Sequence, residues 1–199
     1  MQERFYITFR ALWSRNFRLF LLGQGISVTG SWMQRVALSW LVYQLTNSAF
    51  LLGVVGFANH IPLVILAPLA GVLLDRYSKP RIIFVTQALA MVQALLLAFL
   101  VLSGNIQVWH IVVLSLVLGS VSAFDTQGRQ SFYIQLVDNR KEDLPNAIAL
   151  NSIVFHVSRF LGPSLAGLII AAFGEGVCFL INGLSYLPIL ASLLAIRIG

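Results

Sequence analysis

Residues 71–81 read Gly-Val-Leu-Leu-Asp-Arg-Tyr-Ser-Lys-Pro-Arg and separate two long apolar runs that contain almost no charge. Over the whole chain, 58% of the residues are hydrophobic and 10% are charged. A soluble domain has roughly 25% charged residues and could not bury so much apolar surface. The composition therefore predicts a membrane protein, and the charged block predicts a loop between two of its spans.

Six apolar runs follow one another along the 199 residues, and short connections with turn residues separate them. Each run exceeds the ~17 residues that an untilted helix needs to cross the hydrocarbon core. Because a helix satisfies its own backbone hydrogen bonds in lipid, we predict an all-α polytopic bundle of six transmembrane helices. A segment of residues 1–16 should precede a single transmembrane domain of residues 17–199. The predicted spans are 17–43, 49–74, 82–102, 109–136, 145–173 and 176–196.

Basic residues are distributed unevenly over this topology, since eleven of the thirteen lysines and arginines fall on one side. The loops on the other side contain none, so the positive-inside rule places both termini in the cytoplasm. The net charge of +6 requires no nucleic-acid partner, because anionic lipid headgroups are sufficient. The eleven residues are Arg4, Arg10, Arg15, Arg18, Arg76, Lys79, Arg81, Arg129, Arg140, Lys141 and Arg197.

Arg35 and Arg159 are the two basic residues inside predicted spans. A charge at the bilayer centre costs about 2.5–3.5 kcal/mol on insertion scales, so both are candidates for function. Polar residues at helical spacing form a polar face beside each arginine. The candidates for a substrate cavity are Gln24, Ser27, Ser31, Gln34 and Arg35 on the first span, and Ser152, His156 and Arg159 on the fifth. Interhelical hydrogen bonding is the alternative role for such residues.

The fifth span also contains Gly162, Pro163 and Gly167. A proline in mid-span kinks a helix, and glycine allows a neighbouring backbone to approach closely. We expect this helix to bend and to make a close contact within a moving bundle.

The charged block resembles the signature loop of the major facilitator superfamily. Four residues match the pattern, a basic pair follows with a proline inside it, and Ser78 stands where glycine is usual. The matching positions are Gly71, Leu73, Asp75 and Arg76, and the basic pair is Lys79 and Arg81. The glycine-proline segment of the fifth span is similar to a motif of the antiporters in that superfamily. With residues 30–34 and 142–147, the chain resembles the branch of enterobactin exporters and macrolide efflux proteins.

This family has two six-helix halves, each made of two inverted three-helix repeats, and holds its substrate between the halves. The resemblance implies that the chain is the N-terminal half of a longer transporter in a bacterial inner membrane. Its partner would be a C-terminal half or another copy of the chain. The implied function is proton-coupled efflux of a small amphipathic organic molecule, such as a drug or a siderophore, without a cofactor. A channel-like or non-transporting six-span protein, or a homodimeric half-transporter, is the alternative.

In the family, the aspartate of the signature loop faces the start of a helix in the second half. The resemblance implies such a cytoplasmic latch at Asp75, in a charge cluster with Arg76, Lys79, Asp125 and Arg129. Solvated loop charges are the alternative. Asp125 and Arg129 lie four residues apart and can pair on one helix face. Proton coupling needs a titratable group, and Asp125 and His156 are the candidates within the spans.

An intramembrane serine protease is the enzymatic alternative for six spans. Ser164 and His156 lie eight residues apart on one predicted helix, which separates them by ~12 Å and rules out a hydrogen bond. The three histidines are scattered, with no cysteine or acid at ligand spacing, so no metal site is predicted. We therefore expect a protein that is not an enzyme.

Overall fold

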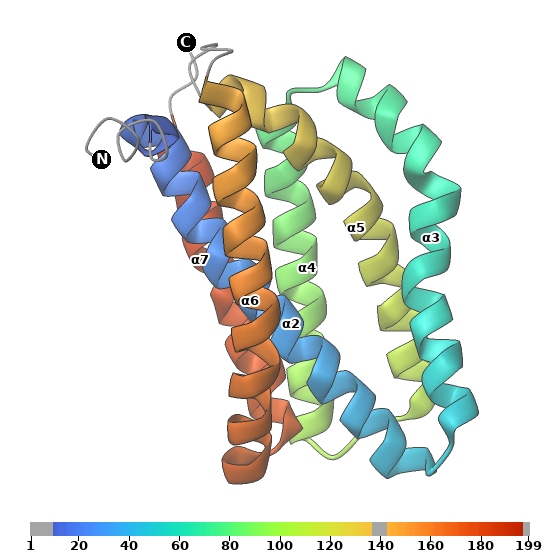
Figure 1. The fold of residues 1–199 in the computed structure, drawn as a ribbon. Helices are drawn as coiled ribbons and strands as arrows, with labels where there is room; N and C mark the ends of the chain where they lie inside the picture. Colours follow the sequence, from blue (N-terminus) through green and yellow to red (C-terminus); the bar gives the residue numbers. More distant parts are fainter. Residues whose placement is uncertain (1–9, 137–142, 197–199) are drawn as a thin grey trace.

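The fold is known from a computed structural model that describes residues 10–136 and 143–196 (Figure 1). Over these residues it consists of one 3-10 turn and six long helices, which confirms the predicted all-α fold. Each helix coincides with a predicted span to within three residues at either end. The elements are η1 (Arg10–Trp13), α2 (Arg15–Thr46), α3 (Ala49–Arg76), α4 (Lys79–Leu102), α5 (Val108–Leu136), α6 (Leu144–Phe173) and α7 (Glu175–Ala195).

Local capping explains where several helices begin and end. The Ser14 hydroxyl accepts a hydrogen bond from the Phe17 amide at 3.4 Å and so caps the start of α2. Asn47 adopts a left-handed conformation with φ of 48° and ends α2, and the Ser48 hydroxyl then caps α3. The α4 helix begins at Lys79, so the basic pair that was expected in the loop belongs to its first turn. Proline is tolerated at that position because the amide there has no helical partner.

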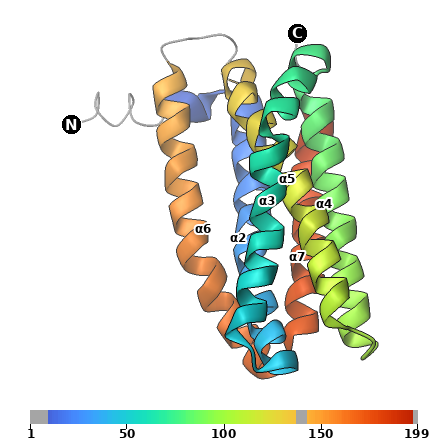
Figure 2. The same cartoon turned by 90° about the vertical axis from the view of Figure 1, so that its right-hand side faces the viewer.

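The helix pairs repeat in a pattern that relates the first three helices to the last three. The α2 helix packs against α6 and α7, and the equivalent helix α5 packs against α3 and α4. The third helices of the two sets, α4 and α7, pack against each other. Figure 2 shows α6 at one side of the bundle and α4 at the other. This arrangement is an inverted three-plus-three repeat, as the resemblance implied.

The α2 helix differs in composition from the other five. Those five are long and apolar enough to cross a membrane, whereas α2 does not meet the same criterion. Its polar side chains explain the difference, and several of them turn into the bundle. Gln24, Ser27 and Gln34 are all buried, with at most 4% of each residue exposed. Because these groups contact other helices and not lipid, α2 spans the bundle despite its polarity.

Two apolar clusters occupy opposite ends of the bundle. One contains Phe17, Phe20, Phe132 and Leu136, near the end where α2 begins and α5 finishes. The other contains residues at the far end of α2 and the first turns of α5 and α7, including Val42, Ile111 and Phe179. Buried polar residues separate the clusters: Gln24, Ser27, Gln34, Gln87, Gln93, Asn182 and Ser185. The interior is therefore apolar at both ends and polar near mid-height.

Candidate functional site

A cavity of about 590 Å³ runs along α2 and is faced by α3 and α5. This volume falls within the roughly 300–1,000 Å³ of small-molecule sites. Four predicted cavity residues line it: Gln24, Ser31, Gln34 and Arg35. Ser27, a fifth candidate on α2, is fully buried behind the wall. The opposite side is formed by Asn59 and His60 of α3 and by Asp125 and Arg129 of α5, among others.

Asp125 is the centre of a polar network that joins α2, α4 and α5. Its Oδ2 accepts from Arg129 Nε at 2.7 Å, and its Oδ1 accepts from Gln87 Nε2 at 2.8 Å and Thr86 Oγ1 at 3.0 Å. The Gln87 side chain in turn accepts from Ser27 Oγ at 3.1 Å. One Arg129 nitrogen, Nη1, is buried without a hydrogen-bond partner. Both carboxylate oxygens of Asp125 thus accept hydrogen bonds from protein groups, and Asp125 is the charge partner of Arg129.

A second network, which we call the amide seam, consists of Gln34, Gln93 and Asn182. Gln34 donates to Gln93 Oε1 at 3.0 Å and accepts from Asn182 Nδ2 at 2.7 Å. Gln93 also donates to the Leu114 carbonyl at 3.4 Å. All three residues are at most 2% exposed. The seam therefore joins α2, α4, α5 and α7 through side chains that satisfy one another.

A third set of polar contacts links α2 to α5 and α6 at the cavity wall. The Gln24 amide and the Tyr133 hydroxyl exchange hydrogen bonds of 3.1 and 3.2 Å. Gln24 also donates to Asn151 Oδ1 at 2.8 Å. Farther along α2, the hydroxyls of Ser31 and Tyr186 lie 3.2 Å apart. These contacts give the uncharged polar face of α2 a packing role in addition to its place in the cavity wall.

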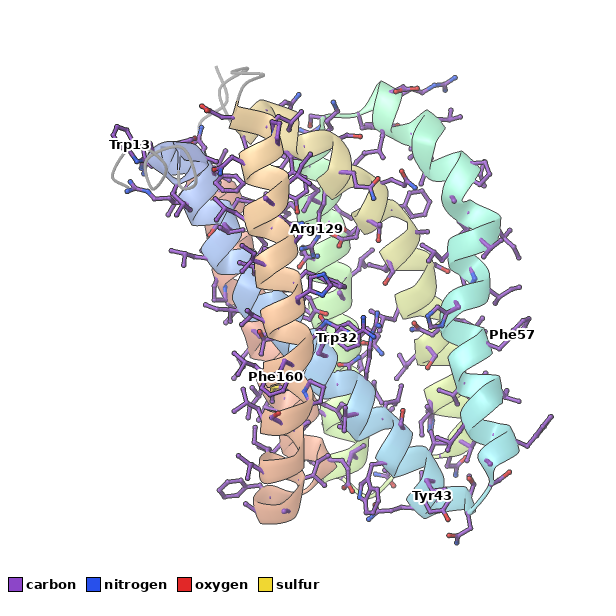
Figure 3. All side chains as sticks on the ribbon, in the orientation of Figure 1. Trp13, Trp32, Tyr43, Phe57, Arg129 and Phe160 are labelled. Atoms are coloured by element: carbon purple, nitrogen blue, oxygen red, sulfur yellow. The ribbon has the colours of Figure 1, made fainter. Side chains whose placement is uncertain are left out.

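The two arginines inside the spans meet at one aromatic ring. The guanidinium carbon of Arg35 lies 4.6 Å from the centroid of the Trp32 ring, and that of Arg159 lies 5.4 Å from the same centroid. Phe155 packs edge-on against Trp32 with 5.9 Å between centroids. Figure 3 shows Trp32 near mid-height of the bundle and Arg129 closer to the end where α2 begins. We call Trp32, Arg35 and Arg159 the arginine cluster.

Neither guanidinium of this cluster has an acidic partner within the part of the chain that the structure describes. Cation–π contact with the indole compensates each charge by only about 0.5–1 kcal/mol at exposed sites. The two guanidinium carbons lie no more than about 10 Å apart, and two unit charges at that distance repel by about 1–2 kcal/mol at an effective dielectric constant of ~20. The cluster is therefore an excess of positive charge held at mid-height of the bundle.

The α6 helix reaches α2 through a close contact at Gly162. A Cβ atom there would lie 2.5 Å from Trp32 Cβ and 2.9 Å from the Thr29 carbonyl oxygen. Gly167 is open, with nothing within 4 Å of such an atom. The helix continues through Pro163. Of the predicted glycine-proline motif, Gly162 is thus the member that brings α6 against Trp32.

The signature loop lies at the end of the bundle where α2 begins (Figure 1). Gly71, Leu73, Asp75 and Arg76 are exposed at the end of α3, and Arg81 is exposed on α4. Among the described residues, neither these five nor Lys79 form an ion pair with Asp125 or Arg129. Of the predicted charge cluster, the structure brings together Asp125 and Arg129. Arg4, Arg140, Lys141 and Arg197 lie outside the described residues.

On α6, the residues at the cavity are shifted by one position from those that the sequence suggested. Asn151 and Phe155 line the cavity, whereas the predicted Ser152, His156 and Arg159 do not. Sequence reasoning also left out Gln87 and Gln93 on α4 and Asn182 on α7. The signal was present, since an amide inside an otherwise apolar span needs a hydrogen-bond partner in the bundle.

The chain is similar in sequence to a family of membrane proteins and to several transporters. Residues 7–198 match the family described as "Transmembrane secretion effector". A "Staphyloferrin A transporter" of Staphylococcus aureus is 29% identical over 87% of the chain. A "Multidrug efflux pump Tap" of Mycolicibacterium fortuitum is 26% identical over 76% of it, and a "Macrolide efflux protein A" of Streptococcus pyogenes is 21% identical over 79%.

The chain spans only about two fifths of the length of these relatives, namely 41%, 36% and 38% respectively. Its repeat of three plus three helices accounts for one half of the family fold. The family match extends over nearly all of the chain, and the relatives include the macrolide efflux proteins that the sequence motifs suggested. The chain therefore belongs to the major facilitator superfamily of membrane transporters.

Proposed function

We propose that the chain forms the N-terminal half of a secondary active transporter that exports a small amphipathic organic molecule by alternating access. The observation that carries this proposal is the cavity along α2, where amide, aromatic and ionisable side chains converge. Such a mixture binds a molecule that has both apolar and polar parts. Two of the similar proteins are a multidrug efflux pump and a macrolide efflux protein, which supports the outward direction.

Proton coupling is part of the proposal, and Asp125 is its candidate carrier. The carboxylate lines the cavity and holds Arg129 at 2.7 Å. Protonation would remove that ion pair and would leave a buried guanidinium without its charge partner. A proton arriving from the cavity would thereby change the packing of α4 against α5. His156, the other candidate, is exposed on α6 and does not line the cavity.

A second six-helix half is the proposed partner, with α3 and α6 facing it. In each of these helices only 17% of the membrane-spanning window is buried, compared with 56% in α7. Large apolar side chains such as Phe57 and Phe160 project from them (Figure 3). The end of the bundle that carries the signature loop would face the cytoplasm, in accordance with the positive-inside rule.

Transport is tested in proteoliposomes with and without a second half. The chain is reconstituted alone and as a chimera with the C-terminal half of the Staphylococcus aureus relative. Three dansyl probes of matched size carry negative, neutral or positive groups, and their accumulation under an imposed pH gradient is measured by fluorescence. We expect the chimera to accumulate at least one probe and the chain alone to accumulate none. The proposal would be contradicted if the chain alone carried the probe down its concentration gradient at a rate that does not depend on pH. Such a result would indicate a channel.

The role of Asp125 is tested in the same chimera. The double variant Asp125→Asn/Arg129→Gln removes both charges, so no arginine is left unpaired in the bundle. We expect it to exchange the probe across the membrane but not to accumulate it against a gradient. The matched control is Glu175→Gln, which removes a carboxylate outside the cavity. Gradient-driven accumulation by the double variant at the unaltered level would show that Asp125 does not carry the coupling proton.

The latch at Asp75 is tested by accessibility labelling. Single cysteines are placed at cavity positions on the two sides of the membrane in the chimera, with Cys178 replaced by alanine. We expect Asp75→Asn to shift labelling toward the inward-open state, because the loop carboxylate no longer binds the helix start in the second half. Unchanged labelling and unchanged transport would support the alternative, in which the loop charges only set the topology.

A further inference from the structure

We propose that the arginine cluster is a binding site for the acidic groups of an organic anion, with Trp32 supporting its apolar body. This inference rests on the proposed transport function and names the substrate class of the same cavity. What the sequence could not show is that Arg35 and Arg159, from different helices, approach one indole ring. Their guanidinium carbons are therefore no farther apart than the sum of their two distances from its centroid.

The charge balance of the cavity favours an anion. Asp125 is the acidic residue in its lining, and that carboxylate is already paired with Arg129. Arg35 lines the same cavity, and Arg159 adds a second positive charge beside Trp32. Among the described residues neither has an acidic partner. The cavity wall thus carries one unpaired arginine, Arg35, with Arg159 beside it at Trp32. A ligand with carboxylates or similar oxyanions would neutralise both charges.

The chemistry of the side chains narrows the class further. A guanidinium presents its N–H groups as a planar fork that matches a carboxylate in a bidentate fashion. Arg35 and Arg159 are both exposed, so their forks remain available to a ligand. Phe155 and Trp32 lie edge to face at 5.9 Å and supply an adjoining apolar surface. An aromatic or aliphatic body that bears two acidic groups fits this surface better than a cationic drug.

Position within the bundle supports the assignment. Gly162 brings α6 so close to α2 that a Cβ atom would lie 2.5 Å from Trp32 Cβ. Thr29 and Ser158 join the same two helices through hydroxyls 2.9 Å apart. A close contact between α2 and α6 therefore keeps the two arginines near each other, although their charges repel. A bound dianion would convert that repulsion into attraction on both sides.

The test measures binding and not transport. The protein is placed in phosphatidylcholine nanodiscs, and binding is followed by fluorescence anisotropy with dansyl-aspartate, which is a dianion, and with its neutral diamide. We expect the protein to bind the dianion roughly ten- to a hundredfold more tightly, as charge-assisted hydrogen bonds would give. Arg35→Gln and Arg159→Gln should each remove most of this preference, and the double variant should bind both probes equally.

Arg18→Gln is the matched control, because it removes an exposed arginine from α2 far from Trp32; its preference for the dianion should be unchanged. Equal affinity for the two probes in the unaltered protein, or a preference that survives in the double variant, would overturn the proposal. If a Gln variant fails to fold, the double variant Arg35→Lys/Arg159→Lys is measured in its place. It keeps both charges but lacks the planar fork, so the preference should fall without disappearing. A preference equal to that of the unaltered protein would overturn the bidentate site.

Anionic lipid is the other source of the same chemistry, since a headgroup phosphate also binds guanidinium. The measurement is therefore repeated in phosphatidylglycerol nanodiscs. A site for a soluble anion keeps its preference for dansyl-aspartate there, whereas loss of the preference would assign the cluster to lipid and overturn the proposal. Failure of the transport test with intact charge-selective binding would contradict the transporter and leave this site standing.

Discussion

Gln34 and Arg35 are neighbours on α2, yet their side chains have opposite environments. Gln34 is 2% exposed, and both of its amide atoms are hydrogen-bonded within the amide seam. Arg35 is exposed, lines the cavity and lies over the Trp32 ring, which Arg159 also approaches. The side chains of the amide seam satisfy one another's hydrogen bonds and hold the helices together. The charges of the arginine cluster are not neutralised by acidic side chains among the described residues. This difference distinguishes polar residues that stabilise the fold from polar residues that are available to bind a ligand.

The Asp125 network provides the sharpest contrast with the arginine cluster, because its arginine is paired. We expect Asp125→Asn to lower the free energy of unfolding by about 3–5 kcal/mol, since it leaves the Arg129 charge in the bundle without a partner. Thermal unfolding in detergent, followed by circular dichroism, measures the change. The double variant Asp125→Asn/Arg129→Gln should recover most of the loss. A double variant as unstable as the single one would mean that charge pairing is not the cause.

The helix contact that holds the arginine cluster should show the next largest effect. Gly162→Ala is expected to cost about 1–3 kcal/mol, because the added methyl group overlaps Trp32 and the α2 backbone. Gly167→Ala is the matched control on the same helix and meets nothing within 4 Å. The same unfolding assay compares the two. Equal midpoints would show that α6 does not press against α2 at Gly162.

The amide seam should contribute less for each group. Asn182→Ala removes the donor to Gln34 and is expected to cost roughly 1 kcal/mol, in line with interhelical hydrogen bonds in membranes. Asn105→Ala, in the exposed turn between α4 and α5, is the control and should be neutral. A loss below the error of the unfolding assay for Asn182→Ala would imply that the seam is not a stabilising contact.

Removal of a charge from the arginine cluster should have the smallest effect, and the opposite sign. Arg159→Gln relieves repulsion from Arg35 but loses a cation–π contact, so we expect a gain of up to about 1 kcal/mol. Arg18→Gln, away from the cluster, should change the unfolding midpoint less. A clear loss of stability in Arg159→Gln would mean that this guanidinium has a structural partner, and the contrast with Gln34 would disappear.

Much of the fold was predictable because hydropathy and turn residues act locally. The run of apolar residues defined each span, and Asn47 with Ser48 marked the boundary between α2 and α3. The register of α6 was less accessible, since Asn151 and Phe155 line the cavity in place of Ser152 and His156. A helix of known length still has an undetermined rotation, which packing against its neighbours decides.

The sequence by itself determined the class of protein, the six helices, the uneven distribution of basic residues and the family to which the chain belongs. These follow from composition, from periodicity and from short motifs, all of which are written in contiguous residues. Only the tertiary structure decided which polar groups meet. Gln34 finds Asn182 across 148 positions of sequence, and Arg35 meets Arg159 at Trp32. Such pairings depend on how distant helices pack, so they determine which polar side chains are already satisfied and which remain available to a ligand.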